Sequence, residues 1–228
     1  MQGRRIITQQ QADLNGDGSL ERVLLTGLQA EDSAAWRSIR LYIREGCLES
    51  RLPLPEDAGY APRLWIGPLT GEGRQDILVS IASGGSGGLG YYTIFTYREG
   101  GYERIFDTES YNGSYAYEID YLDQYRVRAA SLANAVTYLV DIAWKGLEYL
   151  GEIYTPQGVL KAPLSGEVDP LSVLAPVDLS GSGVYSLMAF QRISGRYHAD
   201  GLGDFINVLD WNGQTFALTW QTLGIQGA

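Results

Sequence analysis

The sequence predicts an all-β fold, a small β-propeller built from about four blades of roughly 55 residues each. Three observations lead to this expectation: the composition, a glycine-containing loop that recurs along the chain, and a set of short hairpin turns. The 228 residues include 16 Tyr, 5 Trp and 29 Gly but only 2 Met. Aromatic residues favour strands and glycines favour tight turns, so the composition indicates many short strands.

A loop with two glycines occurs three times, in ADLNGDGSLERVLLTG, GPLTGEGRQDILVSIASG and VDLSGSGVYSLMAFQRISG. The copies share a leucine, which is Leu14, Leu69 and Leu179 in turn, and the second interval is twice the first interval of 55 residues. This spacing predicts a degenerate copy near residue 124, in a unit that has lost its glycines. The expected blades of a single propeller domain are residues 10–60, 61–112, 113–165 and 166–228.

Four turn sequences support this arrangement: IREG, YREGG, AWKG and DWNG, which end at Gly46, Gly101, Gly146 and Gly213. Each lies between strand-like segments, as a hairpin turn does. A single twisted blade cannot cover its own faces, whereas neighbouring blades in a closed ring cover them and leave no open edges. A β-sandwich, or two stacked β domains, is the alternative architecture.

The first copy of the loop has the residues of a calcium site. Carboxylate and amide side chains alternate along it, a glycine follows the third of them, and Ca²⁺ prefers six to eight hard oxygen ligands. An EF-hand would need a bidentate acid at Leu24 and a helix on each side, and the sequence provides neither. The alternative is a polar hairpin without an ion. The sequence predicts one structural calcium ion, held by Asp13, Asn15, Asp17, Ser19 and Glu21.

The pattern D-x-N-x-D-G-x-x-E before a strand resembles the FG-GAP/VCBS repeats of integrin-α-like β-propellers, in which the loop holds calcium. The segments SGGSGGLGYY, QRISGRYHADGLGD and VLDWNGQTFAL also resemble uncharacterised VCBS-repeat proteins of Gram-positive spore-forming bacteria. The resemblance implies a propeller fold and a calcium loop but no reaction. The second and fourth units have lost carboxylates from this pattern, so we expect them to keep the turn without the metal.

Composition excludes several other classes of function. The net charge of −10 disfavours binding to nucleic acid or to anionic membranes. No apolar run approaches the roughly 20 residues that span a bilayer. With one Cys and one His, the chain has no zinc-binding cluster. We expect a monomer that does not insert into membranes.

The competing hypothesis is an enzyme, a hydrolase or lyase acting on a saccharide or another small substrate near Gly84–Gly90 and His198. The sequence GSGGLG matches a dinucleotide-binding pattern, but a strand follows it where that fold needs a helix. Sequence alone places no nucleophile beside a base and an orienting acid, so we assign no catalytic residue. The residues of the possible ligand pocket are Ser86, Gly87, Tyr91, Tyr92, His198 and Asp200.

The favoured function is a calcium-stabilised, non-catalytic binding module that recognises a protein or glycan at the cell envelope. A single calcium site of modest affinity fills at the millimolar calcium of the extracellular space rather than in the cytoplasm. The N-terminal MQGRRIITQQ has no apolar segment typical of a signal peptide, so this location requires that a leader has been removed. A cytoplasmic protein is the alternative.

Overall fold

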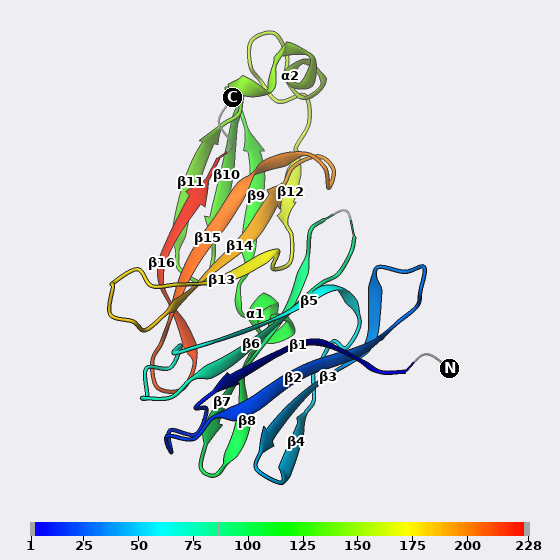
Figure 1. Cartoon of the computed structure of the whole chain (residues 1–228). Coiled ribbons are helices and arrows are strands. Elements are labelled where there is room, and N and C mark those ends of the chain that lie inside the picture. Colours follow the sequence, from blue (N-terminus) through cyan, green and yellow to red (C-terminus); the bar gives the residue numbers. More distant parts are fainter. Residues whose placement is uncertain (1–2, 86, 226–228) are drawn as a thin grey trace.

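The computed structural model describes residues 3–85 and 87–225, which form two antiparallel β-sheets of eight strands each (Figure 1). The first sheet has the strand order β1-β2-β3-β5-β6-β7-β8, and β4 pairs with the remaining length of β3. Its strands are β1 (Arg5–Ala12), β2 (Glu21–Gln29), β3 (Ala35–Glu45), β4 (Leu48–Leu52), β5 (Gly59–Gly67), β6 (Asp76–Ala82), β7 (Gly90–Arg98) and β8 (Gly101–Asp107).

The second sheet has the order β11-β10-β9-β12-β14-β15-β16, and β13 also pairs with β14. The short strand β12 joins its two halves, because it pairs with β9 on one side and with β14 on the other. Its strands are β9 (Tyr117–Leu122), β10 (Arg126–Ser131), β11 (Val136–Asp141), β12 (Ser165–Val168), β13 (Val173–Val177), β14 (Ser186–Ser194), β15 (Gly201–Trp211) and β16 (Phe216–Gly224).

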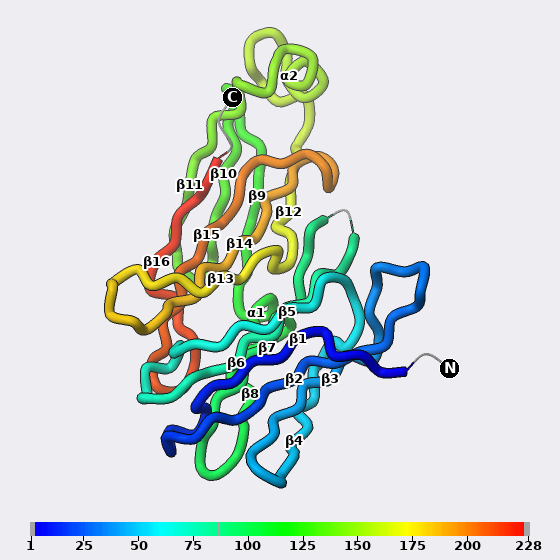
Figure 2. Tube along the Cα trace, in the orientation of Figure 1, coloured from blue at the N-terminus to red at the C-terminus, as the bar shows by residue number. Residues whose placement is uncertain are grey.

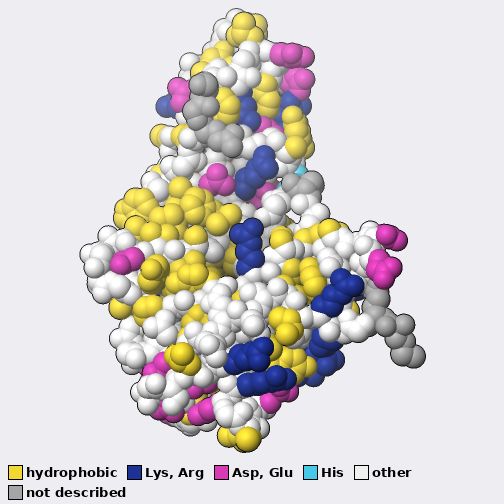
Figure 3. Space-filling view, in the orientation of Figure 1, with side chains coloured by type: hydrophobic (Ala, Val, Ile, Leu, Met, Phe, Trp, Pro, Cys, Tyr) yellow, Lys and Arg dark blue, Asp and Glu magenta, His cyan; other side chains and the backbone are white. Residues whose placement is uncertain are grey.

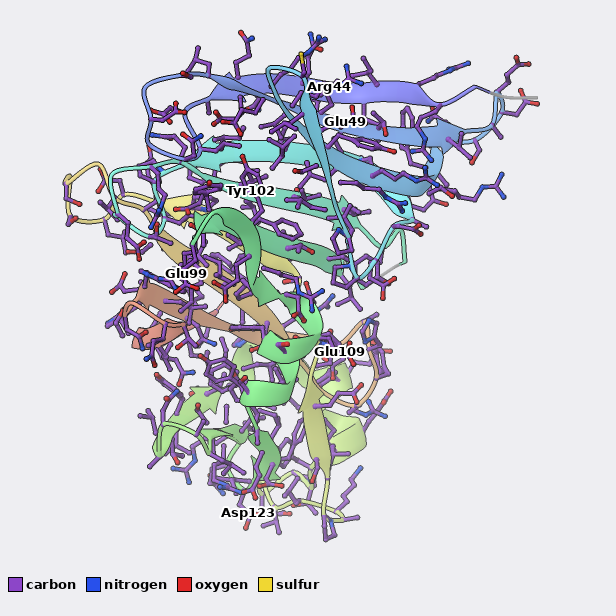
Figure 4. All side chains as sticks on the ribbon, turned by 90° about the horizontal axis from the view of Figure 1, so that it is seen from below. Arg44, Glu49, Glu99, Tyr102, Glu109 and Asp123 are labelled. Atoms are coloured by element: carbon purple, nitrogen blue, oxygen red, sulfur yellow. The ribbon has the colours of Figure 1, made fainter. Side chains whose placement is uncertain are left out.

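Short helices lie at the two ends of the second sheet. Helix α1 (Thr108–Ser114) follows β8 and lies, with Glu109, where the two sheets meet (Figure 4). It begins at Asp107, whose side chain accepts a hydrogen bond from the backbone N–H of Ser110 at 2.8 Å and so caps the helix. The 3-10 turn η1 (Ala143–Lys145) and helix α2 (Leu147–Ile153) cover the opposite end (Figure 1).

Each sheet packs around its own hydrophobic core, and a third core joins the sheets. Strand β6 shows why its sequence DILVSIA is apolar at almost every position. Ile77, Val79 and Ile81 point into the first core, and Leu78 points the other way into the third. Side chains alternate across a strand, so a strand buried on both faces has no polar side.

The third core connects the two halves of the chain. Residues of the first sheet, such as Leu78 and Ile94, pack there with Leu187 and Leu209 of the second. Tyr111 of α1 also belongs to this core, and its hydroxyl accepts a hydrogen bond from the Asn207 side chain at 2.7 Å. The helix therefore helps to fix one sheet on the other.

The expectation of a four-bladed propeller is wrong. The chain is all-β, but β5 runs across the expected boundary between the first two blades and pairs with β3 on one side and with β6 on the other, so the strands of both units form one continuous sheet. In the same way, β12 links the expected third and fourth blades. Pairing across these boundaries merges the four units into two large sheets, which is nearer to the alternative of two β domains.

Most of the expected loops and turns lie where the sequence predicted them, although the predicted arrangement of the strands is wrong. The three glycine loops are the hairpin connections β1–β2, β5–β6 and β13–β14. The turns that end at Gly46, Gly101 and Gly213 also join antiparallel strands. The expected turn at Gly146 is wrong, because that segment lies between η1 and α2. None of the helices in the described part of the chain is long and apolar enough to cross a membrane.

We predict that Leu187→Ala lowers the free energy of unfolding by about 2 to 5 kcal/mol, because it opens a cavity in the core that joins the sheets. Leu187 is fully buried, whereas Leu147 on α2 is 90% exposed and provides a matched control. Leu147→Ala should change stability by less than about 0.5 kcal/mol. Urea unfolding of both variants checks this, and equal losses would show that the third core is not where the structure puts it.

Candidate cation site

The three glycine loops lie in a row along one side of the molecule (Figure 2). The backbone N–H of Gln75 in the second loop donates to the carbonyl oxygen of Asp13 in the first, at 3.3 Å. A Cβ atom added at Gly71 in the second loop would lie 3.3 Å from the Val184 side chain in the third. Each loop therefore touches its neighbour, although the third belongs to the other sheet.

The first loop is held by its own side chains. The Asp13 carboxylate accepts hydrogen bonds from the backbone N–H groups of Gly16 at 2.7 Å and Gly18 at 2.9 Å. The Asp17 carboxylate accepts one from the N–H of Ser19 at 2.7 Å, and this bond lowers the pKa of Asp17. Gly16 and Gly18 have φ of 79° and 86°, a conformation that favours glycine.

Glu21 differs from these exposed acids because it is fully buried. Its Oε2 accepts a hydrogen bond from the backbone N–H of Leu14 at 2.7 Å. Its Oε1 is also buried and has no hydrogen-bond partner among residues 3–85 and 87–225. A buried carboxylate oxygen without a partner is costly, so this atom marks a place where a cation or a proton is needed.

Two further carboxylates lie close to the Glu21 side chain. One oxygen from each of Asp17, Glu21 and Glu45 lies within 4.8 Å of the others. The side-chain amide of Asn15 bridges two of them, since it donates to Asp17 and to Glu45, each at 3.2 Å. Within the described residues, none of the three acids forms an ion pair with a basic side chain.

Glu45 was not among the residues expected from the sequence. Strands β2 and β3 pair with Arg22 opposite Arg44, so Glu21 and Glu45 occupy the next positions outward. The motif IREG predicts a hairpin turn, and no local pattern in it places its glutamate beside the first loop. Like charges at adjacent ends of a strand pair repel, and a cation between them removes the repulsion.

Tyr102 on β8 (labelled in Figure 4) lines the same cavity as Glu45. Its hydroxyl is buried and has no hydrogen-bond partner in the described part of the chain. Burial raises the pKa of Tyr102, and the negative charges of Glu21 and Glu45 raise it further. The phenol therefore stays neutral near the acids.

The second loop shows the same hairpin with its charges already compensated. Asp76 occupies the position of Glu21 and is equally buried, but its carboxylate accepts bonds from the N–H groups of Leu69 at 2.8 Å and Thr70 at 2.7 Å. The Thr70 hydroxyl reaches both of its oxygens. Glu72 pairs with Arg74 and Arg98, which lower the pKa of Glu72.

The third loop keeps one of the carboxylates. Asp178 accepts hydrogen bonds from the N–H groups of Ser182 at 3.1 Å and Gly183 at 2.9 Å, as Asp13 does in the first loop. Ser186 stands where Glu21 stands in the first loop, and its hydroxyl donates to Asp210 at 2.5 Å. Only the first loop thus combines three acids with an unpartnered buried oxygen among the described residues.

The residues expected to form a ligand pocket do not all lie together. Gly87 lies against the His198 ring, because a Cβ atom at Gly87 would lie 2.6 Å from Nε2. Tyr91 and Tyr92 line a different cavity of about 330 Å³ beside α1. Ser86 lies outside the described residues.

His198 has an acidic partner, but the nearby serine among the described residues does not face its ring. Its Nδ1 lies 3.2 Å from the buried Asp169. The Ser194 hydroxyl donates to the other oxygen of Asp169 at 3.1 Å and approaches the backbone oxygen of His198, not its ring. A base must face the proton that it removes, and this serine does not face the imidazole.

Asp200 is buried in a separate network. Lys145 pairs with one of its oxygens, and Tyr149 donates to the other at 2.7 Å. Burial acts to raise the pKa of Asp200, but the hydrogen bonds from Lys145, Tyr149 and the Arg196 N–H outweigh it and lower the pKa. This network ties η1 and α2 to the β14–β15 connection.

The fold and the site define an all-β protein of two curled sheets with a three-carboxylate site at a hairpin loop. A family model described as the YybI C-terminal domain matches residues 115–224, which coincide with the second sheet. The protein named "Uncharacterized protein YybI" of Bacillus subtilis (strain 168) is 44% identical over 227 residues, covering 99% of this chain and 87% of that protein. No solved structure matches the chain.

The chain therefore belongs to the YybI family. The resemblance to FG-GAP/VCBS repeats is wrong, since the comparisons show the YybI family and the sheets do not form blades. The shared element was a short acidic hairpin loop, and such a loop joins paired strands in either architecture.

We predict opposite responses of the two equivalent acids when calcium is removed by a chelator. Asp76→Asn should lower the free energy of unfolding by about 1 to 3 kcal/mol, because it weakens hydrogen bonds to buried backbone groups. Glu21→Gln should leave stability unchanged or raise it, since its amide donates to the neighbouring acids. Urea unfolding in EDTA measures both. A loss at Glu21→Gln equal to that at Asp76→Asn would contradict the assignment of an uncompensated charge.

We also predict a pH-dependent loss of stability for Asp200→Asn. At pH 7 this change leaves the half-buried Lys145 ammonium without its carboxylate partner and should cost about 3 kcal/mol. The pKa of Asp200 is lowered from 3.8, so its contribution is complete above that value and disappears as pH falls through the lower folded pKa. The difference between wild type and variant, measured by urea unfolding, should narrow below about pH 4. A difference that stays constant down to pH 2 would contradict this account.

Proposed function

We propose that this protein is a calcium-stabilised, non-catalytic binding module that recognises its ligand at the cell envelope. The observation that carries the proposal is the fully buried Glu21: its Oε1 lacks a partner among the described residues, and Asp17 and Glu45 each bring a carboxylate oxygen within 4.8 Å of an oxygen of Glu21. Three carboxylates, with the loop carbonyls and the Tyr102 hydroxyl nearby, form a set of hard oxygens. Such a set favours Ca²⁺ over softer metals.

The proposed role of the ion is structural. It neutralises acids that otherwise repel one another, and it fixes the first loop against β3. Because the first loop touches the second and the second touches the third, a rigid first loop also supports the other two. Loops held on a rigid scaffold are common positions for ligand recognition.

Two observations favour recognition over catalysis. In the described part of the chain, the His198 ring faces Gly87 rather than a nucleophile, and the half-buried Lys145 is paired with Asp200. A cavity of about 750 Å³ is instead an open groove beside the second and third loops. A location outside the cytoplasm suits this module, because extracellular calcium modules work at about 10⁻⁴ to 10⁻³ M calcium.

We predict one calcium ion per chain in isothermal titration calorimetry, with Mg²⁺ binding more weakly because it keeps its waters and needs a tighter octahedral site. Calcium at ten times its Kd should stabilise the fold by about 1.4 kcal/mol. Glu21→Gln should abolish the binding heat and the thermal shift.

Asp76→Asn is the matched control, because Asp76 occupies the same position in the second loop. It should lower the melting temperature but keep the calcium-induced shift. The proposal fails if wild type shows neither heat nor shift at 10 mM calcium, a concentration about ten times the upper end of the range for extracellular modules. It also fails if Glu21→Gln binds calcium as wild type does.

A further inference from the structure

A groove of about 750 Å³ lies between the second and third glycine loops and the outer face of β14 to β16. Figure 3 shows hydrophobic side chains gathered on the surface over this part of the second sheet. Ligand sites in proteins commonly have this volume and combine apolar walls with a few placed polar groups. The groove draws Leu69 and Thr70 from the first sheet, so both halves of the chain build it.

Three aromatic side chains line the groove: Tyr185, Trp211 and Trp220. Two of them are held in place. The Tyr185 ring meets Trp65 edge to face at 5.3 Å between centroids, and the Trp211 ring lies 5.2 Å from the Arg98 guanidinium carbon. Trp220 is 54% exposed, and no hydrogen bond or ring contact holds its indole within residues 3–85 and 87–225. It is therefore an open platform.

A row of polar groups completes the groove. Asp210 accepts hydrogen bonds from the Ser186 hydroxyl at 2.5 Å and the Thr219 hydroxyl at 2.7 Å, one on each carboxylate oxygen. The Ser180 hydroxyl donates to the Ser182 hydroxyl at 2.8 Å on the third loop. These hydroxyls can rotate to donate to or accept from a ligand.

The charges along the groove exclude several classes of ligand. Asp210 is the only charged side chain among the lining residues, and both of its oxygens already accept hydrogen bonds. The groove therefore offers no cation to an anionic ligand. A wholly apolar ligand would remove the Asp210 charge from water and would leave the remaining lone pairs of the hydroxyls without hydrogen bonds, which costs free energy.

We propose that this groove binds a neutral saccharide, whose C–H face stacks on Trp220 while its hydroxyls bond to the Ser186–Asp210–Thr219 row. A pyranose ring with equatorial hydroxyls has apolar faces and a polar edge, and the groove presents the same two surfaces. Aromatic side chains with electron-rich faces attract such C–H groups. This inference rests on the proposed binding function and names its ligand class.

Isothermal titration of the calcium-loaded full chain with cellohexaose and with chitohexaose tests the proposal. We expect one site per chain for at least one of these flat neutral oligosaccharides. Trp220→Ala should weaken binding at least about tenfold through the loss of stacking. Trp144→Ala is the matched control: Trp144 is 41% exposed and lies on η1 away from the groove, so its loss should leave the affinity unchanged.

A second variant tests the polar row. Asp210→Ala removes the acceptor that orients Ser186 and Thr219, and it should also weaken saccharide binding while leaving calcium binding intact. The hydrophobic dye 8-anilinonaphthalene-1-sulfonate provides the competing outcome. Dye binding that depends on Trp220, together with no heat from either oligosaccharide, would overturn the proposal in favour of an apolar partner. Equal saccharide affinity in wild type and Trp220→Ala would overturn it too.

Calcium titration of the same samples separates this proposal from the one on which it rests. Calcium binding without saccharide binding refutes the ligand class alone. Saccharide binding that depends on Trp220, in a protein that binds no calcium, supports the groove and refutes the calcium-stabilised module.

Discussion

The burial of Glu21 is the constraint on which this account of the molecule depends. Its carboxylate is completely removed from solvent, and only one of its oxygens is satisfied by a backbone N–H. The antiparallel pairing of β2 and β3 brings Glu45 alongside, and the loop brings Asp17. A charge in this position must be compensated by a cation, by protonation or by a change of structure. Asp76 shows that the same hairpin can be compensated by the protein itself, with backbone N–H groups and Thr70 in place of a metal.

The three glycine loops touch one another in turn, so the structure of the first loop affects the junction of the two sheets. The first loop contacts the second. Glu72 of the second loop pairs with Arg98 on β7, and Arg98 also donates to the carbonyl oxygen of Gly213 at 3.0 Å, so this pair connects the two sheets. The third loop then forms one wall of the aromatic groove. The proposed ion at one end of the row and the proposed ligand at the other would therefore bind to connected parts of one framework. Stabilisation of the first loop limits the motion of the surfaces that we propose for recognition.

The sequence predicted the hairpins but not how they join. Paired glycines, alternating strands and turn residues are local signals, and they identified the loops after β1, β5 and β13. Whether successive hairpins pair edge to edge or separate into blades depends on contacts such as Ala35 with Tyr60, which no local pattern encodes. The same is true of the candidate cation site, because local sequence indicates some of its residues and only the fold shows the others. The loop sequence alone indicates Asp17 and Glu21. The proximity of Glu45 depends on the register of β2 and β3, which the sequence does not show. Only the folded loop shows that the Asp13 carboxylate binds two backbone N–H groups.

A crystal structure of the full chain grown with calcium tests the central claim most directly. The account predicts a single ion about 2.3 to 2.6 Å from Glu21 Oε1, with Asp17 and Glu45 oxygens in the same coordination sphere. Anomalous scattering would identify the element. Density for a water molecule at that oxygen, with Asp17 and Glu45 turned outward into solvent, would contradict the account, because the buried charge would then be compensated without a metal.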